Sequence, residues 1–496
     1  MNLESKECQI IKFLIVNFQL SIVNFPLSIF NYMAMVELEN IKQVYLLGIG
    51  GIGMSALARY FSFAGMQVSG YDKTPSPLTD ELITEGIPVH FSADTDLMPK
   101  VSERESTLVI FTPAVPESFG EMKMLRENQF NLVKRSEVLG ALSRGKKCLA
   151  VAGTHGKTSV TTMTAYLLKE SHVDCCAFMG GISRNYGTNL LLPDNHSDLM
   201  VAEADEFDRS FLRLFPEMAV ITWMDPDHLD IYGTAENLVD AFATFTGQIN
   251  KGGVLLYRKG VAVDFSWNKE ISYYCYSATG DADFRAENVV VEEGAYHFDV
   301  ISPFGTVKGI RLHYPGLMNV ENMTAAIALA LMNGVTPIEI LASIPGYRGV
   351  ERRFDIRYKG RQVVYIDDYG HHPRELEATI KSVRHLYPGR KITGIFQPHL
   401  FTRTRDFADG FAESLDLLDE ALVMEIYPAR EEPIEGVDAG LILGKMKLKS
   451  KRRCSAADFP AILDDYKIDI LLTLGAGDID RLVNPIVDYL KEKEDA

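Results

Sequence analysis

One segment carries, in an order typical of nucleotide-binding loops, the residues that phosphate chemistry needs. It follows an apolar run from Cys148 to Ala152 and comprises Gly153, Thr154, His155, Gly156, Lys157, Thr158 and Ser159. In such loops backbone N–H groups surround phosphate oxygens, the lysine reaches the β- and γ-phosphates and the threonine hydroxyl binds Mg²⁺. Val151 stands where the longer form of the loop has its first glycine, so this loop is shortened. We therefore expect residues 153–159 to bind ATP.

A second glycine-rich turn lies earlier in the chain, between an apolar strand pattern and a helical pattern. Its residues Gly48, Gly50 and Gly53 have G-x-G-x-x-G spacing, with Gly51 between them. Such glycines let backbone N–H groups approach a pyrophosphate at a helix N-terminus. Asp72 ends the next predicted strand, where a Rossmann fold binds a ribose. The pattern predicts a nucleotide or UDP-sugar site at these five residues, and the alternative is a plain strand–helix turn.

Regular elements must hold these loops, and the chain predicts an α/β fold throughout. Its 496 residues exceed what one hydrophobic core accommodates, so two or three domains are expected. A third block follows the Gly/Pro-rich residues 344–349, and its expected strands span 362–367, 391–396, 421–426 and 468–474. Strands that alternate with helices form parallel sheets covered by helices. Two phosphate-binding turns on successive domains indicate one nucleotide as substrate and another as energy source.

Composition narrows the class of protein. The net charge of −17 argues against a protein that coats nucleic acid, although local cations can still bind phosphates. The cysteines are scattered without a CxxC pair, at positions 8, 148, 175, 176, 275 and 454. This usage favours a reducing cytoplasm over a disulfide framework or a zinc site. A monomer or homodimer is expected.

The first 35 residues have a different character. Residues 13–36 carry no charge and contain a near repeat, which could indicate a signal peptide or membrane anchor. Polar residues such as Asn17 and Asn24, together with Pro26, disfavour a helix in lipid. We expect residues 1–35 to be a non-structural extension or an over-called start, without stable membrane association.

Nine ordered segments resemble motifs of the Mur ligase family of ATP-dependent amide-bond ligases. The segments are residues 48–55, 153–159, 203–208, 225–232, 315–322, 352–355, 367–373, 396–405 and 475–478. The resemblance implies three domains. These are a Rossmann-like N-terminal domain (36–145) for a UDP-sugar, a central P-loop-type ATPase domain with a parallel sheet (146–345), and a Rossmann-like C-terminal domain (346–496) for ATP and the amino acid.

The resemblance also implies the reaction. ATP would phosphorylate the lactyl carboxylate of UDP-N-acetylmuramic acid, and L-alanine would attack the acyl phosphate, giving ADP, phosphate and a peptidoglycan precursor. Alternatives are a related ligase that attaches a peptide to the same UDP-sugar, an NAD-dependent dehydrogenase suggested by the first glycine motif alone, and a non-enzymatic binding module. The dehydrogenase does not account for Lys157 and Thr158.

Family roles carry over to the central domain one residue at a time. Thr158 and Glu203 resemble the ligands of the Mg²⁺ between the β- and γ-phosphates, and His228 resembles the ligand of a second Mg²⁺. Glu203 follows an apolar strand, whose carboxyl end is where α/β sites lie, although a strand-end carboxylate can also cap a loop. Lys157, His228 and Arg353 are the expected catalytic residues.

The remaining expected ligands come mostly from the third domain. Arg353 resembles the arginine at the γ-phosphate and Asp368 a residue that holds ATP, whereas Arg352 and Arg353 could instead form surface ion pairs. The other expected ATP ligands are Asn319 and Asn322, and the expected amino-acid ligands are His371, His372, His399 and Arg403. The family pattern is broken by Met318, where it has a histidine, and by Leu400, where a basic residue is common. His371 and His372 also precede a helix pattern that starts at Pro373.

Overall fold

The computed structural model describes residues 41–92, 98–207, 209–226, 229–292, 294–429, 431–465 and 467–495. The segment predicted as an extension, 1–35, lies outside the described residues. Contacts divide the chain into two compact units, one that ends at Lys146 and one that begins at Lys147. None of the helices in the described part of the chain has the length and apolar composition that crossing a membrane requires.

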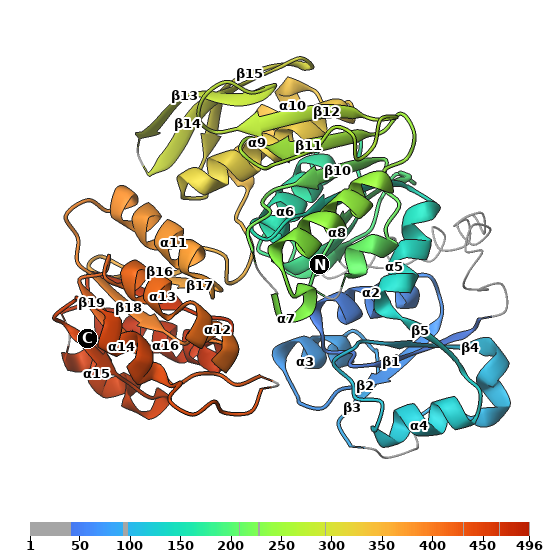
Figure 1. The fold of residues 1–496 in the computed structure, drawn as a ribbon, viewed down its shortest axis with the longest axis horizontal. Helices are drawn as coiled ribbons and strands as arrows, with labels where there is room; N and C mark the ends of the chain where they lie inside the picture. Colours follow the sequence, from blue (N-terminus) through green and yellow to red (C-terminus); the bar gives the residue numbers. More distant parts are fainter. Residues whose placement is uncertain are drawn as a thin grey trace, which may run out of the picture. The chain divides into compact units, whose positions relative to one another are not determined.

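The first unit is a five-stranded parallel sheet with the order β3-β2-β1-β4-β5 (Figure 1). Its strands are β1 (Gln43–Leu47), β2 (Gln67–Tyr71), β3 (Val89–His90), β4 (Thr107–Phe111) and β5 (Asn131–Lys134). Its helices are α2 (Ile52–Phe63), α3 (Pro77–Thr84), α4 (Gly120–Glu127) and α5 (Arg135–Arg144). The first glycine turn joins the central strand β1 to α2, which is the Rossmann-like position predicted from the sequence.

The second unit contains two sheets, and the larger one holds the phosphate-binding loop. Its order is β15-β14-β13-β12-β11-β10-β6-β9-β7-β8. The strands are β6 (Lys147–Ala152), β7 (Cys176–Ser183), β8 (Thr188–Leu191), β9 (Leu199–Glu203), β10 (Met218–Ile221), β11 (Val254–Arg258), β12 (Ser272–Ser277), β13 (Phe284–Glu292), β14 (Ala295–Ser302) and β15 (Gly305–Leu312). From β13 to β7 each strand pairs in parallel with its neighbour, as predicted, whereas β14 pairs antiparallel with β13 and β15, and β8 pairs antiparallel with β7.

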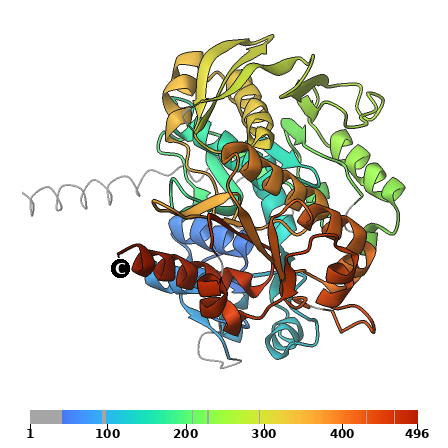
Figure 2. The ribbon, with the colours of Figure 1, turned by 90° about the vertical axis from the view of Figure 1, so that its left-hand side faces the viewer.

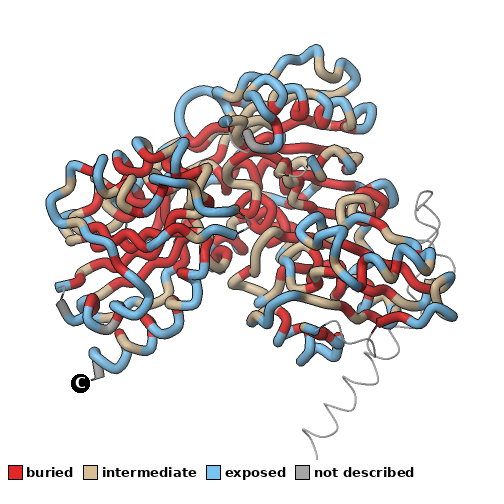
Figure 3. Tube along the Cα trace, turned by 60° about the horizontal axis from the view of Figure 1, so that its bottom comes forward, coloured by how far each residue is buried: buried red, intermediate tan, exposed pale blue. Residues whose placement is uncertain are grey.

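Helices cover this sheet. They are α6 (Lys157–Lys169), α7 (Leu229–Tyr232), α8 (Ala235–Gly247), α9 (Leu317–Met332) and α10 (Pro337–Ser343). Most residues of α6 and α9 are buried, because these two helices pack against each other as well as against strands. Figure 3 shows buried residues along the strands and exposed residues on the outer helices. The loop before α6 is therefore held by a densely packed support.

The C-terminal sheet has the order β16-β17-β21-β18-β19-β20. Its strands are β16 (Asp355–Lys359), β17 (Val364–Asp368), β18 (Ile392–Phe396), β19 (Glu420–Val423), β20 (Lys451–Arg453) and β21 (Ile470–Leu474). Its helices are α11 (Pro373–Leu386), α12 (Phe401–Asp406), α13 (Ala408–Leu415), α14 (Ala439–Lys445), α15 (Phe459–Asp465) and α16 (Val483–Asp495). Only β16 runs antiparallel to its neighbour.

Both faces of the C-terminal sheet are buried, as in a doubly wound fold. Ile366 and Phe396 belong to the apolar cluster that includes residues of α11 and α13, whereas Tyr365 and Ile395 belong to a cluster with residues of α15 and α16. Helices accordingly lie on either side of these strands (Figure 2). The predicted α/β class is confirmed by a structure with three sheets, and the four predicted C-terminal strands match β17, β18, β19 and β21 within a few residues.

Candidate active site

The phosphate-binding loop leaves the carboxyl end of β6, between β10 and β9. Gly153 and Gly156 have φ values of 128° and 81°, which non-glycine residues rarely adopt. A Cβ on Gly153 would lie 2.2 Å from the Thr222 hydroxyl oxygen, and that hydroxyl donates to the His155 carbonyl. Among the described residues no side chain caps the N-terminus of α6. Its first N–H groups are therefore available to an anion.

Lys157 lies close to three carboxylates, those of Glu203, Asp205 and Glu206. Its ammonium donates to the Gly153 carbonyl at 2.8 Å and to Glu206 Oε1 at 2.9 Å, and Asp205 lies 3.9 Å away. Burial opposes the charge on Lys157, but Glu206, Asp205 and Glu203 raise its pKa. Burial raises the pKa of Glu206, which has no exposed surface, to about 7. The lysine therefore stays cationic beside a carboxyl group that titrates near neutrality.

Thr158 and Glu203, the two predicted ligands of one Mg²⁺, are in direct contact. The Thr158 hydroxyl donates to Glu203 Oε1 at 3.0 Å, and the Gly180 N–H donates to Oε2 at 3.1 Å. Burial raises the pKa of Glu203, so a nearby cation would favour its charged form. Such an oxygen-donor pair fits Mg²⁺. No group of three His, Cys, Asp or Glu side chains suited to a metal occurs within the described ranges; His228 lies outside them.

His155 joins the loop to the start of α11. Its Nδ1 lies 3.2 Å from Glu375 Oε1 and its Nε2 lies 3.4 Å from Asp225 Oδ2. Arg374 forms a further ion pair with Asp225. Burial opposes the charge on His155, but Asp225 and Glu375 raise its pKa to about 9. At neutral pH the His155 imidazolium thus joins the loop to two carboxylates, Asp225 and Glu375, and Glu375 belongs to α11.

His155→Gln is expected to lower the urea unfolding midpoint at about pH 6 and to change it little at about pH 10. The folded-state pKa of about 9 lies above the ordinary value of about 6.5. The stabilisation is therefore full below about pH 6.5 and is lost as the pH rises through the folded-state pKa. Urea titrations of both proteins at the two pH values test this, with the exposed His313→Gln as control. A gap of equal size at both pH values would refute the ion-pair origin.

Arg353 extends into the same region from the C-terminal side. Its guanidinium carbon lies 4.8 Å from the centre of the Tyr369 ring. Burial opposes its charge, whereas Glu375, Asp368, Tyr369 and Glu203 raise its pKa. Glu203, the predicted metal ligand, is thus one of the carboxylates that favour the charged form of Arg353. No hydrogen bond or ion pair joins its guanidinium to any other residue that the structure describes, so its planar fork remains available to an anion.

Asp368 has a different environment from the one that an exposed nucleotide ligand would have. Its oxygens accept hydrogen bonds from the N–H groups of Phe354 and Gly370, both at 2.7 Å. Burial raises its pKa to about 6, while Arg353 and the two N–H groups act in the opposite direction. In this structure Asp368 stabilises the turn that carries Arg353. Its predicted contact with ATP stays a prediction.

Of the four predicted amino-acid ligands, His371 and His372 follow the carboxyl end of β17, His399 follows that of β18, and Arg403 lies further along the chain. The rings of His371 and His399 are 6.1 Å apart, and His399 stacks on Tyr427. His372 caps α11, because its ring nitrogen accepts from the Arg374 N–H at 3.3 Å. Arg403, in α12, is 9% exposed. The structure therefore gives His372 the helix-end position that the alternative interpretation of the histidine pair expected.

Of the two predicted asparagines of α9, Asn322 lies against the phosphate-binding loop and Asn319 bonds within the start of its own helix. A Cβ on Gly156 would lie 3.0 Å from Asn322 Oδ1, so Asn322 lies against the loop. The Asn322 amide donates to Asn319, and the Asn319 amide donates to the Pro315 carbonyl. Asn319 therefore orders the start of α9. Their contacts with ATP stay predictions.

In the first unit the glycine turn is ordered by Asp72. Its Oδ2 accepts from the Gly50 N–H at 2.8 Å, and Gly48 has φ 83°. A Cβ on Gly53 would lie 2.4 Å from Arg135, so the arginine side chain lies across the turn. Asp72 thus contacts the turn in this structure, and its contact with a ribose stays a prediction.

Sequence reasoning missed two carboxylates, Glu206 and Glu375. Glu206 stood inside a family-like segment, but no spacing rule placed it against Lys157. Glu375 had a detectable signal, because a polar residue followed three positions later by Glu is a helix-start pattern. The structure shows that this glutamate accepts from the N–H groups of His371 and His372 and also contacts His155.

Family models match most of the chain. The "Mur ligase family, catalytic domain" matches residues 43–147, the "Mur ligase middle domain" matches 151–330, and the "Mur ligase, glutamate ligase domain" matches 352–477. The UDP-N-acetylmuramate–L-alanine ligase of Phocaeicola vulgatus is 49% identical over 460 residues, which cover 92% of this chain and 100% of the relative. The ligase of the same name from Porphyromonas gingivalis is 50% identical over 454 residues, covering 91% and 99%.

Solved structures are similar along nearly the whole chain. The UDP-N-acetylmuramate-alanine ligase of Thermotoga maritima has a TM-score of 0.76 at 25% identity, covering 91% of this chain and 99% of that one. A murein peptide ligase of Psychrobacter arcticus has a TM-score of 0.66 at 20% identity, covering 90% and 98%. The second similarity concerns the fold alone.

Proposed function

Because this chain belongs to the Mur ligase family, we propose that it joins L-alanine to the lactyl carboxylate of UDP-N-acetylmuramic acid. ATP is converted to ADP and phosphate. The observation that carries this proposal is the pairing of Thr158 with Glu203 beside Lys157, with Arg353 in the same electrostatic field. Relatives named for this reaction at 49% and 50% identity support the choice of substrates.

In the first step a carboxylate oxygen of the UDP-sugar attacks the γ-phosphorus of ATP. The attacking carboxylate oxygen forms a new bond to the γ-phosphorus. The bond between the γ-phosphorus and the β,γ-bridging oxygen breaks, and ADP leaves with that oxygen. The attacking carboxylate and the β- and γ-phosphates are all negatively charged and lie close together in this step. Lys157, the loop N–H groups and Arg353 therefore bind and align the phosphates. Lys157 carries its positive charge in this step, because neighbouring carboxylates raise its pKa.

Mg²⁺ would be held by Thr158 and Glu203, whose oxygens lie 3.0 Å apart. When bound, it supplies positive charge to the phosphate oxygens. We also propose His228 as the ligand of a second ion. The Gly180 N–H orients Glu203 by binding its other oxygen. A side chain at Gly180 would displace this carboxylate, since a Cβ there would lie 2.2 Å from Oε2.

In the second step the uncharged amine of L-alanine attacks the acyl carbon. A C–N bond forms, the bond to the phosphate oxygen breaks, and phosphate leaves as the amine loses a proton. We place the amino acid at His371, His372, His399 and Arg403, at the carboxyl ends of β17 and β18. An arginine suits the alanine carboxylate, because its planar fork donates two parallel hydrogen bonds. Asn319, Asn322 and Asp368 complete the proposed ATP site.

Arg403→Lys is expected to raise the KM for L-alanine much more than the KM for ATP. Lysine keeps the charge but loses the paired hydrogen bonds, which is worth about 1–3 kcal/mol or roughly ten- to hundredfold in affinity. Steady-state kinetics with each substrate varied in turn measures this. Arg405→Lys is the control, because that exposed arginine pairs with Asp406 on the same helix. An unchanged alanine KM would remove the amino acid from this site, and a raised ATP KM would indicate a phosphate role.

The UDP-sugar is assigned to the first unit, at Gly48, Gly50, Gly51, Gly53 and Asp72. The reaction is assigned to the cytoplasm, which agrees with five free cysteines among the described residues.

A ligase that adds a tripeptide to the same UDP-sugar is the nearest alternative. Phosphate release with UDP-N-acetylmuramic acid, MgATP and either L-alanine or the tripeptide separates the two. Turnover with the tripeptide and none with L-alanine would overturn the proposed amine.

A further inference from the structure

The turn that carries Arg353 connects the ATPase sheet to the C-terminal sheet and has an unusual backbone. Gly349, Arg352 and Phe354 have φ values of 89°, 59° and 46°. Positive φ is disfavoured for arginine and phenylalanine, so surrounding contacts must hold this conformation. The turn is therefore a place where small losses of support change the direction of Arg353.

Hydrogen bonds from both sheets support the backbone of this turn. On the ATPase side, Glu351 N–H donates to the Ile182 carbonyl at 2.9 Å and Arg184 N–H donates to the Gly349 carbonyl at 2.9 Å. On the C-terminal side, Tyr369 N–H donates to the Arg352 carbonyl. The turn is thus anchored on two separate sheets.

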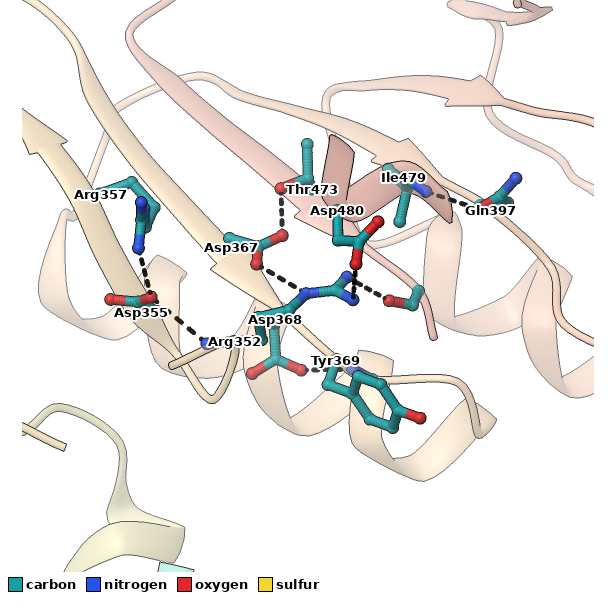
Figure 4. Close-up of polar contacts among 12 residues, drawn as sticks. Arg352, Asp355, Arg357, Asp367, Asp368, Tyr369, Gln397, Thr473, Ile479 and Asp480 are labelled. Atoms are coloured by element: carbon teal, nitrogen blue, oxygen red, sulfur yellow. Dashed lines mark hydrogen bonds and ion pairs between the residues drawn. The ribbon is translucent and has the colours of Figure 1, made fainter. Parts of the chain in front are cut away.

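The two adjacent arginines have different surroundings, and Figure 4 shows those of Arg352. The Arg352 guanidinium donates to Asp367 at 3.1 Å and to the Gly475 carbonyl at 2.6 Å, and it lies 3.8 Å from Asp480. Its guanidinium carbon also lies 5.4 Å from the centre of the Tyr369 ring, so its partners all belong to the C-terminal part of the chain. The Arg353 guanidinium only faces the Tyr369 ring among the described residues, so it is the one available to a phosphate.

Arg184 grips the turn from the ATPase side. It directly follows β7, and its guanidinium forms a forked contact with Asp355, with Nη2 at 2.9 and 2.8 Å from the two oxygens and Nε at 3.1 Å. Nη1 donates to Glu351 at 3.2 Å. Glu351 and Asp355 flank Arg353 on either side. The Asp355 side chain is 6% exposed and that of Arg184 is 29% exposed, and the forked arginine–carboxylate geometry makes the pair directional.

We propose that Arg184 is a positioning residue that holds Arg353 toward the γ-phosphate through Glu351 and Asp355. This inference rests on the proposed role of Arg353 in the ligase reaction. Asp355 also receives the Arg352 N–H at 3.3 Å, so the clamp reaches the residue with φ 59° directly. Without the clamp the turn keeps its C-terminal anchors and its backbone hydrogen bonds to the ATPase sheet, but it loses its side-chain anchor on that sheet.

The test compares affinities for two nucleotides, because only one of them carries a γ-phosphate. Titration calorimetry with MgADP and with the magnesium complex of a β,γ-imido ATP analogue gives their affinity ratio. Arg353→Ala and Arg184→Gln are each expected to lower the preference for the analogue about tenfold. Arg184→Lys keeps the charge without the fork and should lower it in part.

Arg357→Gln is the matched control. Arg357 also contacts Asp355, at 3.3 Å, but it belongs to β16 and makes no bridge between the sheets. Its loss should leave the ratio unchanged. The inference is overturned if Arg184→Gln lowers thermal stability or both affinities equally without changing the ratio, or if Arg357→Gln lowers the ratio as much. An unchanged ratio in Arg353→Ala would overturn the proposed γ-phosphate role as well, which separates the two failures.

Discussion

Lys157→Ala is expected to lower kcat by about a hundred- to a thousandfold, the usual cost of removing one preorganised charge from a transition state. The lysine follows Gly156 at the start of α6, where its ammonium already contacts the Gly153 carbonyl of the same loop. It therefore lies where the phosphates of ATP would meet the loop. Steady-state phosphate release with all three substrates saturating measures the effect.

Two further variants separate this catalytic loss from a folding defect. Lys169→Ala removes the lysine at the other end of the same helix, where it pairs with Asp174 and Asp194, and should retain kcat. Lys157→Ala/Glu206→Gln removes the buried carboxylate that the single variant leaves without its 2.8 Å partner, and restored stability without restored activity is expected. Near-parental kcat in folded Lys157→Ala would remove the loop from the mechanism.

Glu203→Ala is expected to lower activity and to shift half-maximal activation to higher Mg²⁺ concentration, by about ten- to a hundredfold. Its carboxylate is the oxygen donor opposite the Thr158 hydroxyl, at 3.0 Å, and burial raises its pKa. A buried carboxylate of this kind gains most from a nearby cation. Titration of activity with Mg²⁺ at fixed ATP measures the shift.

Glu217→Gln is the control for this experiment, since Glu217 precedes β10 and its carboxylate accepts a hydrogen bond from the Asn250 amide at 3.5 Å, away from the loop. Its Mg²⁺ titration should coincide with that of the parent. If Glu203→Ala also retains the parental curve, the carboxylate has a structural role, such as ordering Gly180, and the metal assignment is wrong.

The sequence allowed the loops and the order of elements to be predicted, because both depend on local patterns. The glycines at 153 and 156 take backbone angles that other residues avoid, and apolar runs with strand–helix alternation locate β17, β18, β19 and β21. The antiparallel pairings of β8 with β7 and of β14 with β13 and β15 were not anticipated. Their pairing depends on hairpin contacts rather than on the period of a buried parallel strand.

Side-chain partners across domains could not be predicted. Arg352 and Arg353 are the same residue type at adjacent positions. Both guanidinium groups lie near the Tyr369 ring, and only the turn with φ 59° and 46° at residues 352 and 354 directs Arg352 to Asp367 and leaves Arg353 without a carboxylate partner among the described residues. Likewise, nothing local pairs His155 with Glu375, which lies 220 residues later. Such contacts follow from tertiary packing, which one-dimensional spacing does not encode.

The central claim is that ATP activates the carboxylate as an acyl phosphate, and isotope transfer tests it most directly. UDP-N-acetylmuramic acid with ¹⁸O in both oxygens of its lactyl carboxylate is converted with L-alanine and MgATP, and the released phosphate is analysed by mass spectrometry. One labelled oxygen should appear in each phosphate, because the bond that breaks in the second step leaves that oxygen on phosphorus. Phosphate without label, or release of pyrophosphate in place of phosphate, would contradict the mechanism.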